Sequence, residues 1–219
     1  MHCKYNRHSF CEEYYDFLPF SEPMHIKNSV VKRRSDFLAG RITAMFALEK
    51  IGIKNTSVPI GNNRMPIFPE GCVGSITHTC ARAFVAVSKK ENTSLIGIDC
   101  EKKISSLLAR NISLEILLDS EIKNFNKMKI SFSLYCTIVF SAKESLFKTL
   151  YPVVGVFFGF KSAQVEINSD ISGFKIKVIH PLGDFKGVEF YGRIEIFSDS
   201  VLTIITSSNT FESPLLLNY

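Results

Sequence analysis

The stretch VGSITHTCARAFVAVSKKENTSLIGIDCE, residues 73–101, decides the fold because it predicts three strands with no helix between them. The runs at 73–78, 83–89 and 94–101 are rich in apolar and β-branched residues and are separated by polar breaks. A doubly wound parallel sheet needs a crossover helix between neighbouring strands, so this stretch argues against that fold.

One order of elements, a helix followed by strands, is predicted twice along the chain. Helices are expected at 28–51, with Asn28 as the N-terminal cap, and at 113–127 and 132–150. Further strands are expected at 162–169, 173–180, 187–197 and 200–207. We therefore predict the α+β class, built from two similar halves at 1–105 and 106–219. Duplication of one half is a hypothesis that rests on element order alone.

The composition narrows the class of protein. The chain has 219 residues, of which 46% are hydrophobic and 21% charged, and this balance excludes disorder for the bulk of the sequence. No apolar run is long enough to cross a membrane, and the N-terminus lacks the pattern of a signal peptide. We expect a cytoplasmic protein whose six cysteines are reduced. The net charge of +5 is too mild for a nucleic-acid binder and suits an anionic substrate or an acidic partner.

Two carboxylates at the end of one predicted strand are the first candidates for chemistry. Asp99 and Glu101 are two residues apart, so their side chains share one face of the strand. Adjacent carboxylates repel each other unless a cation lies between them, and Mg²⁺ prefers such ligands together with phosphate oxygens. The alternative is an ordinary solvated strand end.

A second acidic and basic pair lies in the predicted helix at 132–150. Glu144 and Lys148 are four residues apart and share a helix face. Spacing alone favours an exposed ion pair, and the functional alternative is a further metal ligand with an ammonium for a phosphate.

Three arginines and a histidine could bind an anion. On the helix predicted at 28–51, Arg34 and Arg41 fall within the apolar arc and Arg33 at its border, so each either extends to solvent or binds an anion. His78 is flanked by Thr77 and, three residues before it, Ser75. His78 is either a hydrogen-bonded core residue or, with the two hydroxyls, a phosphate contact.

The loop before these strands carries one more cation. Arg64 is either a solvated loop charge or a further phosphate contact. Nucleotide-binding glycine loops and the common hydrolase motifs are missing from the sequence.

Five segments in this order resemble the 4′-phosphopantetheinyl transferases of the Sfp superfamily, most closely the enterobactin-synthase-component type. They are RRSDFLAGR at 33–41, RMPIFP at 64–69, GSITH at 74–78, GIDCE at 97–101 and FSAKESLFK at 140–148. The resemblance covers about residues 28–160, and its most specific part is the spacing between the last two segments.

The resemblance implies a monomeric pseudo-dimer of two α+β halves with coenzyme A bound between them. Such an enzyme uses Mg²⁺ to move the 4′-phosphopantetheine arm to a serine of an apo carrier protein, often for siderophore or nonribosomal peptide synthesis. It releases adenosine 3′,5′-bisphosphate.

The resemblance also assigns roles to individual positions. Metal ligands are implied at Asp99 and Glu101, with the main-chain carbonyl of Cys100, and at Glu144, which is also the expected base. Lys148 is implied at the pyrophosphate. Coenzyme phosphates are implied at Arg33, Arg41, Arg64, Ser75, Thr77 and His78. The resemblance favours Arg33, whereas the helical wheel favours Arg34.

Two other functions remain possible from the sequence. One is a relative that binds coenzyme A or another nucleotide without transferase activity. The other is an α+β interaction module whose charges are surface charges.

Overall fold

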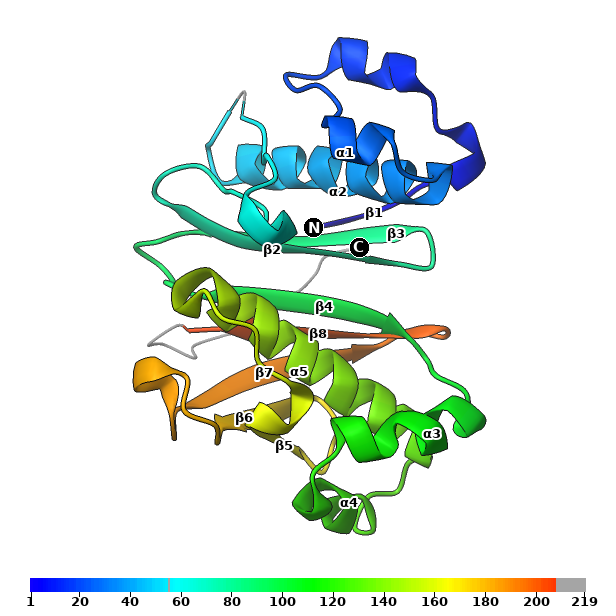
Figure 1. The fold of residues 1–219 in the computed structure, drawn as a ribbon, viewed down its shortest axis with the longest axis vertical. Helices are drawn as coiled ribbons and strands as arrows, with labels where there is room; N and C mark the ends of the chain where they lie inside the picture. Colours follow the sequence, from blue (N-terminus) through cyan, green and yellow to red (C-terminus); the bar gives the residue numbers. More distant parts are fainter. Residues whose placement is uncertain (55, 208–219) are drawn as a thin grey trace.

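The protein is described by a computed structural model that covers residues 1–54 and 56–207. Within these residues the strands form two antiparallel sheets, in the orders β1-β3-β2 and β4-β8-β7-β6-β5, with helices packed against them (Figure 1). The predicted α+β class is therefore confirmed. The last part of the half predicted at 106–219, residues 208–219, lies outside the described residues.

The elements have the following bounds. The strands are β1 (His2–Lys4), β2 (Cys72–Thr79), β3 (Arg82–Lys89), β4 (Ile96–Lys102), β5 (Ala163–Ile167), β6 (Gly173–Val178), β7 (Glu189–Ile196) and β8 (Ser200–Thr206). The α-helices are α1 (Met24–Lys27), α2 (Val31–Lys50), α3 (Ser106–Ile116), α4 (Asp119–Phe125) and α5 (Phe132–Val154). Short 3-10 helices are η1 (Arg7–Ser9), η2 (Glu12–Phe17), η3 (Asn62–Arg64), η4 (Phe160–Ser162) and η5 (Gly183–Phe185).

The first half places α2 against the three-stranded sheet. The helix begins at Val31, after the extended residue Val30, and not at the predicted cap Asn28. Asn28 instead ends the short helix α1, so the chain must turn before α2 can begin. Ala44, Leu48 and Val85 join these elements in a small apolar core.

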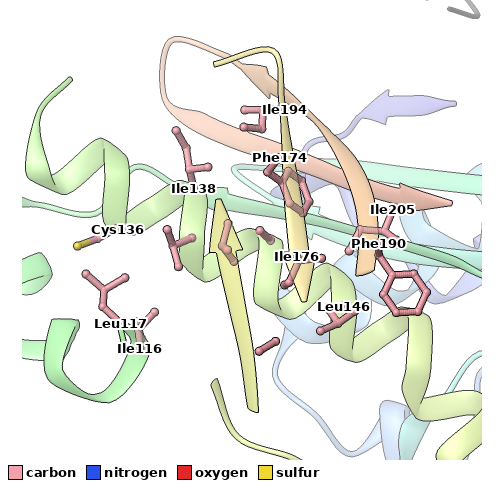
Figure 2. Close-up of a cluster of buried hydrophobic side chains, with 14 of the residues drawn as sticks. Ile116, Leu117, Cys136, Ile138, Leu146, Phe174, Ile176, Phe190, Ile194 and Ile205 are labelled. Atoms are coloured by element: carbon pink, nitrogen blue, oxygen red, sulfur yellow. The ribbon is translucent and has the colours of Figure 1, made fainter. Parts of the chain in front are cut away.

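The second half packs α5 across the five-stranded sheet over a large apolar core. Figure 2 shows Ile138 and Leu146 of α5 among side chains of the sheet such as Phe174 and Ile205. The helix includes Pro152 in its last turn, at the cost of the one i→i−4 hydrogen bond that a proline cannot donate, and Gly155 ends it with φ 67°.

The helix predicted at 113–127 is two helices. Ser105 caps α3 by accepting a hydrogen bond from the Leu108 N–H. Leu117 and Leu118 are extended, and they separate α3 from α4. The apolar periodicity runs through this break, so the sequence pattern does not reveal it.

The two sheets meet edge to edge at β2 and β4, and side chains connect them across this contact, which we call the joint. β4 pairs with β8 of the second sheet, although it precedes residue 105 in the chain. Its other edge faces β2, where the Ser75 hydroxyl accepts a hydrogen bond from the Ile98 N–H at 3.1 Å. The Thr77 hydroxyl accepts one from the Cys100 N–H at 3.3 Å. The i, i+2 spacing of two hydroxyls thus matches the i, i+2 spacing of two N–H groups.

The helices are short or too polar to span a bilayer: within residues 1–54 and 56–207, none meets the length and hydropathy that a crossing requires.

Candidate active site

The face of β4 that carries the two predicted acids packs against α5. At Gly97 an added Cβ would overlap the carbonyl oxygen of Ser145 and the hydroxyl of Thr149. Glycine therefore permits a close approach of strand and helix that any side chain would prevent. Asp99 is the next residue on this face, and the close approach brings its carboxylate to the helix.

Asp99 is the centre of the site's hydrogen bonds, and only 3% of its surface is exposed. The Lys148 ammonium lies 2.7 Å from its Oδ1 atom. The Ser141 hydroxyl donates to Oδ2 at 3.0 Å, and the Thr77 hydroxyl donates to Oδ1 at 3.3 Å. Spacing alone favoured an ion pair between Lys148 and Glu144 in the same helix, and the structure pairs Lys148 with Asp99 of the neighbouring strand instead.

Two more carboxylates add negative charge beside this pair. Burial, together with the negative charges of Asp99 and Glu144, raises the pKa of Glu101 to about 7, against the opposing charge of Lys148. Burial, followed by the charge of Asp99, also raises the pKa of Glu144. Both shifts mean that this site disfavours further negative charge and would gain from a bound cation.

The carboxylates do not form a complete metal cage. Within the described chain, no group of three or more histidine, cysteine, aspartate and glutamate side chains is arranged to hold a metal ion. Cys100 packs with Phe84, Ile98 and Leu202 in an apolar cluster, and burial raises the pKa of its thiol. A metal role for Cys100 therefore rests on its main-chain carbonyl and stays a prediction.

The opposite face of β2 brings His78 to α2. Arg33 Nη1 lies 3.4 Å from His78 Nε2. On the other side of the ring, His78 Nδ1 lies 3.7 Å from Asp36 Oδ2. Burial lowers the pKa of His78, and the charges of Arg33 and Lys148 lower it further, while Asp36 opposes them.

The structure gives Arg34 different partners from Arg33. Its guanidinium lies 2.7 Å from Glu12 and 2.5 Å from Glu22, and its charge is therefore already paired. Arg33 instead faces His78. The position at the border of the apolar arc is thus the one that is directed toward the other candidate residues.

Arg41 is buried in α2, with 7% of its surface exposed. Its guanidinium lies 4.7 Å from the centre of the Phe37 ring, and its Nε finds no hydrogen-bond partner among the described residues. Burial, together with the charge of Arg33, lowers its pKa to about 10. A buried donor without a partner is costly, and an anion would satisfy it.

The loop that carries Arg64 contacts α5. Asn63 donates a hydrogen bond from Nδ2 to the Tyr151 hydroxyl at 2.5 Å. Asn63 and Arg64 both have positive φ angles, 53° and 65°. Tyr151 lies one helical turn beyond Lys148, so the loop and Arg64 are held near the same end of the site.

Ser75 and Thr77 were expected to bind phosphate, and in the structure their hydroxyls accept hydrogen bonds from the main chain of β4. Both residues are buried, with 3% and 5% of their surfaces exposed, and both bond to β4 across the joint. A phosphate role for them stays a prediction.

Beside Glu144 lies a cavity of about 280 Å³, with an aromatic wall that includes Phe147, Phe157 and Phe158. Phe147 stacks on Tyr151, with ring centres 4.9 Å apart. The charged residues at the joint therefore lie beside an apolar cavity.

Sequence reasoning missed two residues of this arrangement, Ser141 and Asp36. Ser141 precedes Lys148 by seven residues, two turns of helix, and this spacing could have indicated a shared face. Asp36 follows Arg33 by three residues and could have been placed beside it in the same way.

Comparisons with known proteins match most of the chain to one family. Two family models match the chain: the 4′-phosphopantetheinyl transferase N-terminal domain over residues 21–88 and the 4′-phosphopantetheinyl transferase superfamily over residues 95–203. The division between them falls in the connection between β3 and β4.

Curated relatives carry the same family name or a related one. Enterobactin synthase component D of Salmonella typhi is 31% identical over 208 residues, which are 93% of this chain and 83% of that protein. Its Escherichia coli K12 counterpart is 38% identical over 141 residues, 64% of this chain and 65% of that protein. The 4′-phosphopantetheinyl transferase PptT of Mycobacterium tuberculosis is 29% identical over 157 residues, 72% of this chain and 68% of that protein. The chain therefore belongs to the 4′-phosphopantetheinyl transferase superfamily and is an enzyme of phosphopantetheine transfer.

Proposed function

We propose that the chain transfers the 4′-phosphopantetheine arm of coenzyme A to a serine of an apo carrier protein, in a reaction that requires Mg²⁺. The observation that carries this proposal is the Asp99–Lys148 pair at the joint, with Glu101 and Glu144 beside it. Phosphoryl-type transfer depends mainly on positioning and charge stabilisation, and the joint offers both signs of charge.

Mg²⁺ would be held by Asp99, Glu101 and Glu144, with the main-chain carbonyl of Cys100 as a further oxygen. The raised pKa values of Glu101 and Glu144 support this set, because burial and the neighbouring carboxylates disfavour their charged forms and a cation would stabilise those forms. The absence of a closed cage of side chains among the described residues also suits Mg²⁺, because this ion completes its octahedral shell with phosphate oxygens and water. The bound ion would neutralise charge on the pyrophosphate oxygens.

Glu144 and Lys148 have different roles in the proposed reaction. Glu144 takes the proton of the carrier serine as the general base. The serine oxygen forms a bond to the phosphorus that bears the pantetheine arm, and the bond from that phosphorus to the bridging pyrophosphate oxygen breaks. Lys148 stabilises the charge of the departing adenosine 3′,5′-bisphosphate. Asp99 holds Lys148 in place.

The remaining cations would bind the coenzyme's phosphates. We assign these contacts to Arg33, His78, Arg41 and Arg64, and we prefer Arg33 to Arg34 because Arg34 is already paired with two carboxylates. The partnerless Nε of Arg41 supports its assignment. The aromatic cavity beside Glu144 would receive the pantetheine arm.

The partner would be a peptidyl, aryl or acyl carrier domain, and the product would serve siderophore or nonribosomal peptide synthesis. The names of the enterobactin synthase relatives support this assignment. The enzyme would act as a monomer, since one chain supplies every residue of the proposed site. Its six unpaired cysteines suit the reducing cytoplasm.

The test is mass spectrometry of several apo carrier domains incubated with the enzyme, coenzyme A and Mg²⁺. We expect one phosphopantetheine to be added to the acceptor serine, and we expect a chelator to stop the reaction. Coenzyme A binding without a mass change on any carrier would instead identify a binding protein that lacks transferase activity.

A further inference from the structure

The N-terminal segment before residue 21, which the family models do not match, converges on one buried carboxylate of α2. Asp36 has only 3% of its surface exposed. Tyr5, just after β1, donates its hydroxyl hydrogen to Asp36 Oδ1. Arg7 donates from Nε to Oδ1 at 2.9 Å and from Nη2 to Oδ2 at 3.4 Å. A short segment of chain thus fixes the position of this carboxylate.

Asp36 in turn faces His78, and the contacts of His78 define where its proton lies. Arginine can only donate hydrogen bonds, so the Nε2 atom that faces Arg33 at 3.4 Å must accept. The single proton of the neutral ring then lies on Nδ1, which faces Asp36 Oδ2 at 3.7 Å. Asp36 therefore favours one tautomer and one orientation of the ring.

We propose that Asp36, held by Tyr5 and Arg7, is a positioning residue that keeps the His78 Nδ1–H toward itself and turns Nε2 toward the coenzyme's phosphate. This inference rests on the proposed function, in which His78 contacts that phosphate. To donate a hydrogen bond there, the ring takes a proton from solvent at Nε2, and the charge of Asp36 stabilises the imidazolium.

Three charged groups act on His78 from the elements around it. Asp36 and Arg33 come from α2, and Lys148 comes from α5. The two cations oppose protonation until an anion neutralises them, whereas Asp36 favours it throughout. A bound phosphate and Asp36 would thus act on the ring in the same direction.

The first experiment measures the tautomer without any ligand. In the full-length wild-type protein, ¹⁵N NMR of the histidine rings is expected to show His78 protonated at Nδ1. In Asp36→Asn the Nδ1–H signature should weaken or move to Nε2. The matched control is Glu22→Gln, which loosens the buried ion pair with Arg34 but does not contact His78. A wild-type His78 protonated at Nε2, or a signature unchanged in Asp36→Asn, would overturn the proposal.

The second experiment measures coenzyme A binding and turnover with the same variants. Asp36→Asn is expected to weaken coenzyme A binding about tenfold, with kcat changed by less than about threefold. Tyr5→Phe keeps the charge of Asp36 and removes one anchor, so it should give a smaller loss in the same direction, and it serves if Asp36→Asn does not fold. A loss of kcat with unchanged coenzyme affinity would contradict a positioning role.

The two experiments separate this inference from the proposed function. If wild-type protein binds coenzyme A but modifies no carrier, the transferase proposal fails while the Asp36 effect on affinity can still be measured. If carriers are modified and Asp36→Asn binds coenzyme A normally, the transferase proposal stands and the Asp36 inference is wrong.

Discussion

Two lysines of α5, five residues apart, each pair with a buried carboxylate, yet their surroundings differ. Lys143 lies 2.8 Å from Glu121, and the two side chains are 2% and 0% exposed. Lys148 lies 2.7 Å from Asp99, and the two side chains are 28% and 4% exposed. The distances are nearly equal, so the difference lies in access to solvent and in what else surrounds each pair.

The Glu121 pair is saturated by the protein itself. One carboxylate oxygen accepts from the Val165 N–H at 2.7 Å, and the other accepts from the Leu118 N–H and from Lys143. Lys143 also donates to the Ile116 carbonyl. These bonds connect α3, α4, α5 and β5. We infer that this pair fixes the structure and has no capacity left for a ligand.

The hydrogen-bonding groups of the Asp99–Lys148 pair are not all satisfied by the described residues in this way. Its ammonium reaches solvent, and two neighbouring carboxylates have raised pKa values. An ion pair in a motif therefore indicates function when one of its side chains is accessible to solvent and when the neighbouring carboxylates have raised pKa values. Geometry of the pair alone does not distinguish the two.

The largest expected effect on stability is at the saturated pair. Glu121→Gln leaves the Lys143 ammonium buried without a counter-charge, so the free energy of unfolding should fall by about 3–5 kcal/mol. Urea unfolding measures it. The control is Glu166→Gln, which removes an exposed carboxylate that pairs with Lys175 and should cost less than about 1 kcal/mol. Equal effects of the two substitutions would show that the buried pair is not structural.

Lys148→Gln should affect mainly activity. Loss of the ammonium removes charge stabilisation at the pyrophosphate, and turnover of an apo carrier should fall about 100-fold. The unfolding free energy should change less than in Glu121→Gln, because Asp99 keeps its bonds from Ser141 and Thr77. Steady-state kinetics and urea unfolding on the same preparation measure both quantities. Unchanged turnover would remove Lys148 from the proposed site.

Gly97→Ala should disturb the open pair through the backbone. The added methyl overlaps Ser145 and Thr149, so β4 must move away from α5 at a cost of about 1–3 kcal/mol. Turnover should also fall, because Asp99 moves together with β4. Gly159→Ala is the control for stability, because its Cβ would meet open space and its φ is −85°. A fully active, fully stable Gly97→Ala protein would contradict the close packing.

Glu101→Gln should change how stability depends on pH in metal-free protein. Burial raises the pKa of Glu101 from 4.5 to about 7, so the folded state binds the proton more tightly than the unfolded state. Stability is then fully present below about pH 4.5 and is lost as the pH rises through about 7. Allowing for partial solvent screening, the loss is on the order of 1 kcal/mol.

Urea unfolding of wild type and Glu101→Gln at about pH 5 and about pH 8 tests this dependence. The wild type should lose stability relative to the variant at the higher pH. If the difference in unfolding free energy between the two proteins is the same at both pH values, the pKa of Glu101 is not raised in the folded state.

Local sequence patterns predicted most elements of the fold but not how the strands associate. The runs at 73–78 and 83–89 became β2 and β3, and that at 94–101 became β4. The partner of β4 is β8, about a hundred residues later, because pairing is decided by tertiary packing and not by local propensity. The hydroxyls of Ser75 and Thr77 belong to that same joint, which no local pattern describes.

The candidate site was predictable as a set of residues and not as a set of contacts. Periodicity placed Asp99 with Glu101 and Glu144 with Lys148, each within one element. Lys148 pairs with Asp99, 49 residues away, and such a contact depends on Gly97 allowing the strand to approach the helix. The helical wheel likewise favoured Arg34, whose partners Glu12 and Glu22 come from a segment that carried no recognisable motif.

The most direct test of the central claim, that the open pair at the joint performs the transfer, is the rate at which Asp99→Asn modifies an apo carrier domain. Mass spectrometry should show a rate at least about 100-fold below wild type with coenzyme A and Mg²⁺ present. The unfolding free energy should stay within about 1 kcal/mol of wild type, because Lys148 can turn to solvent. An Asp99→Asn enzyme that modifies the carrier at the wild-type rate would contradict the claim.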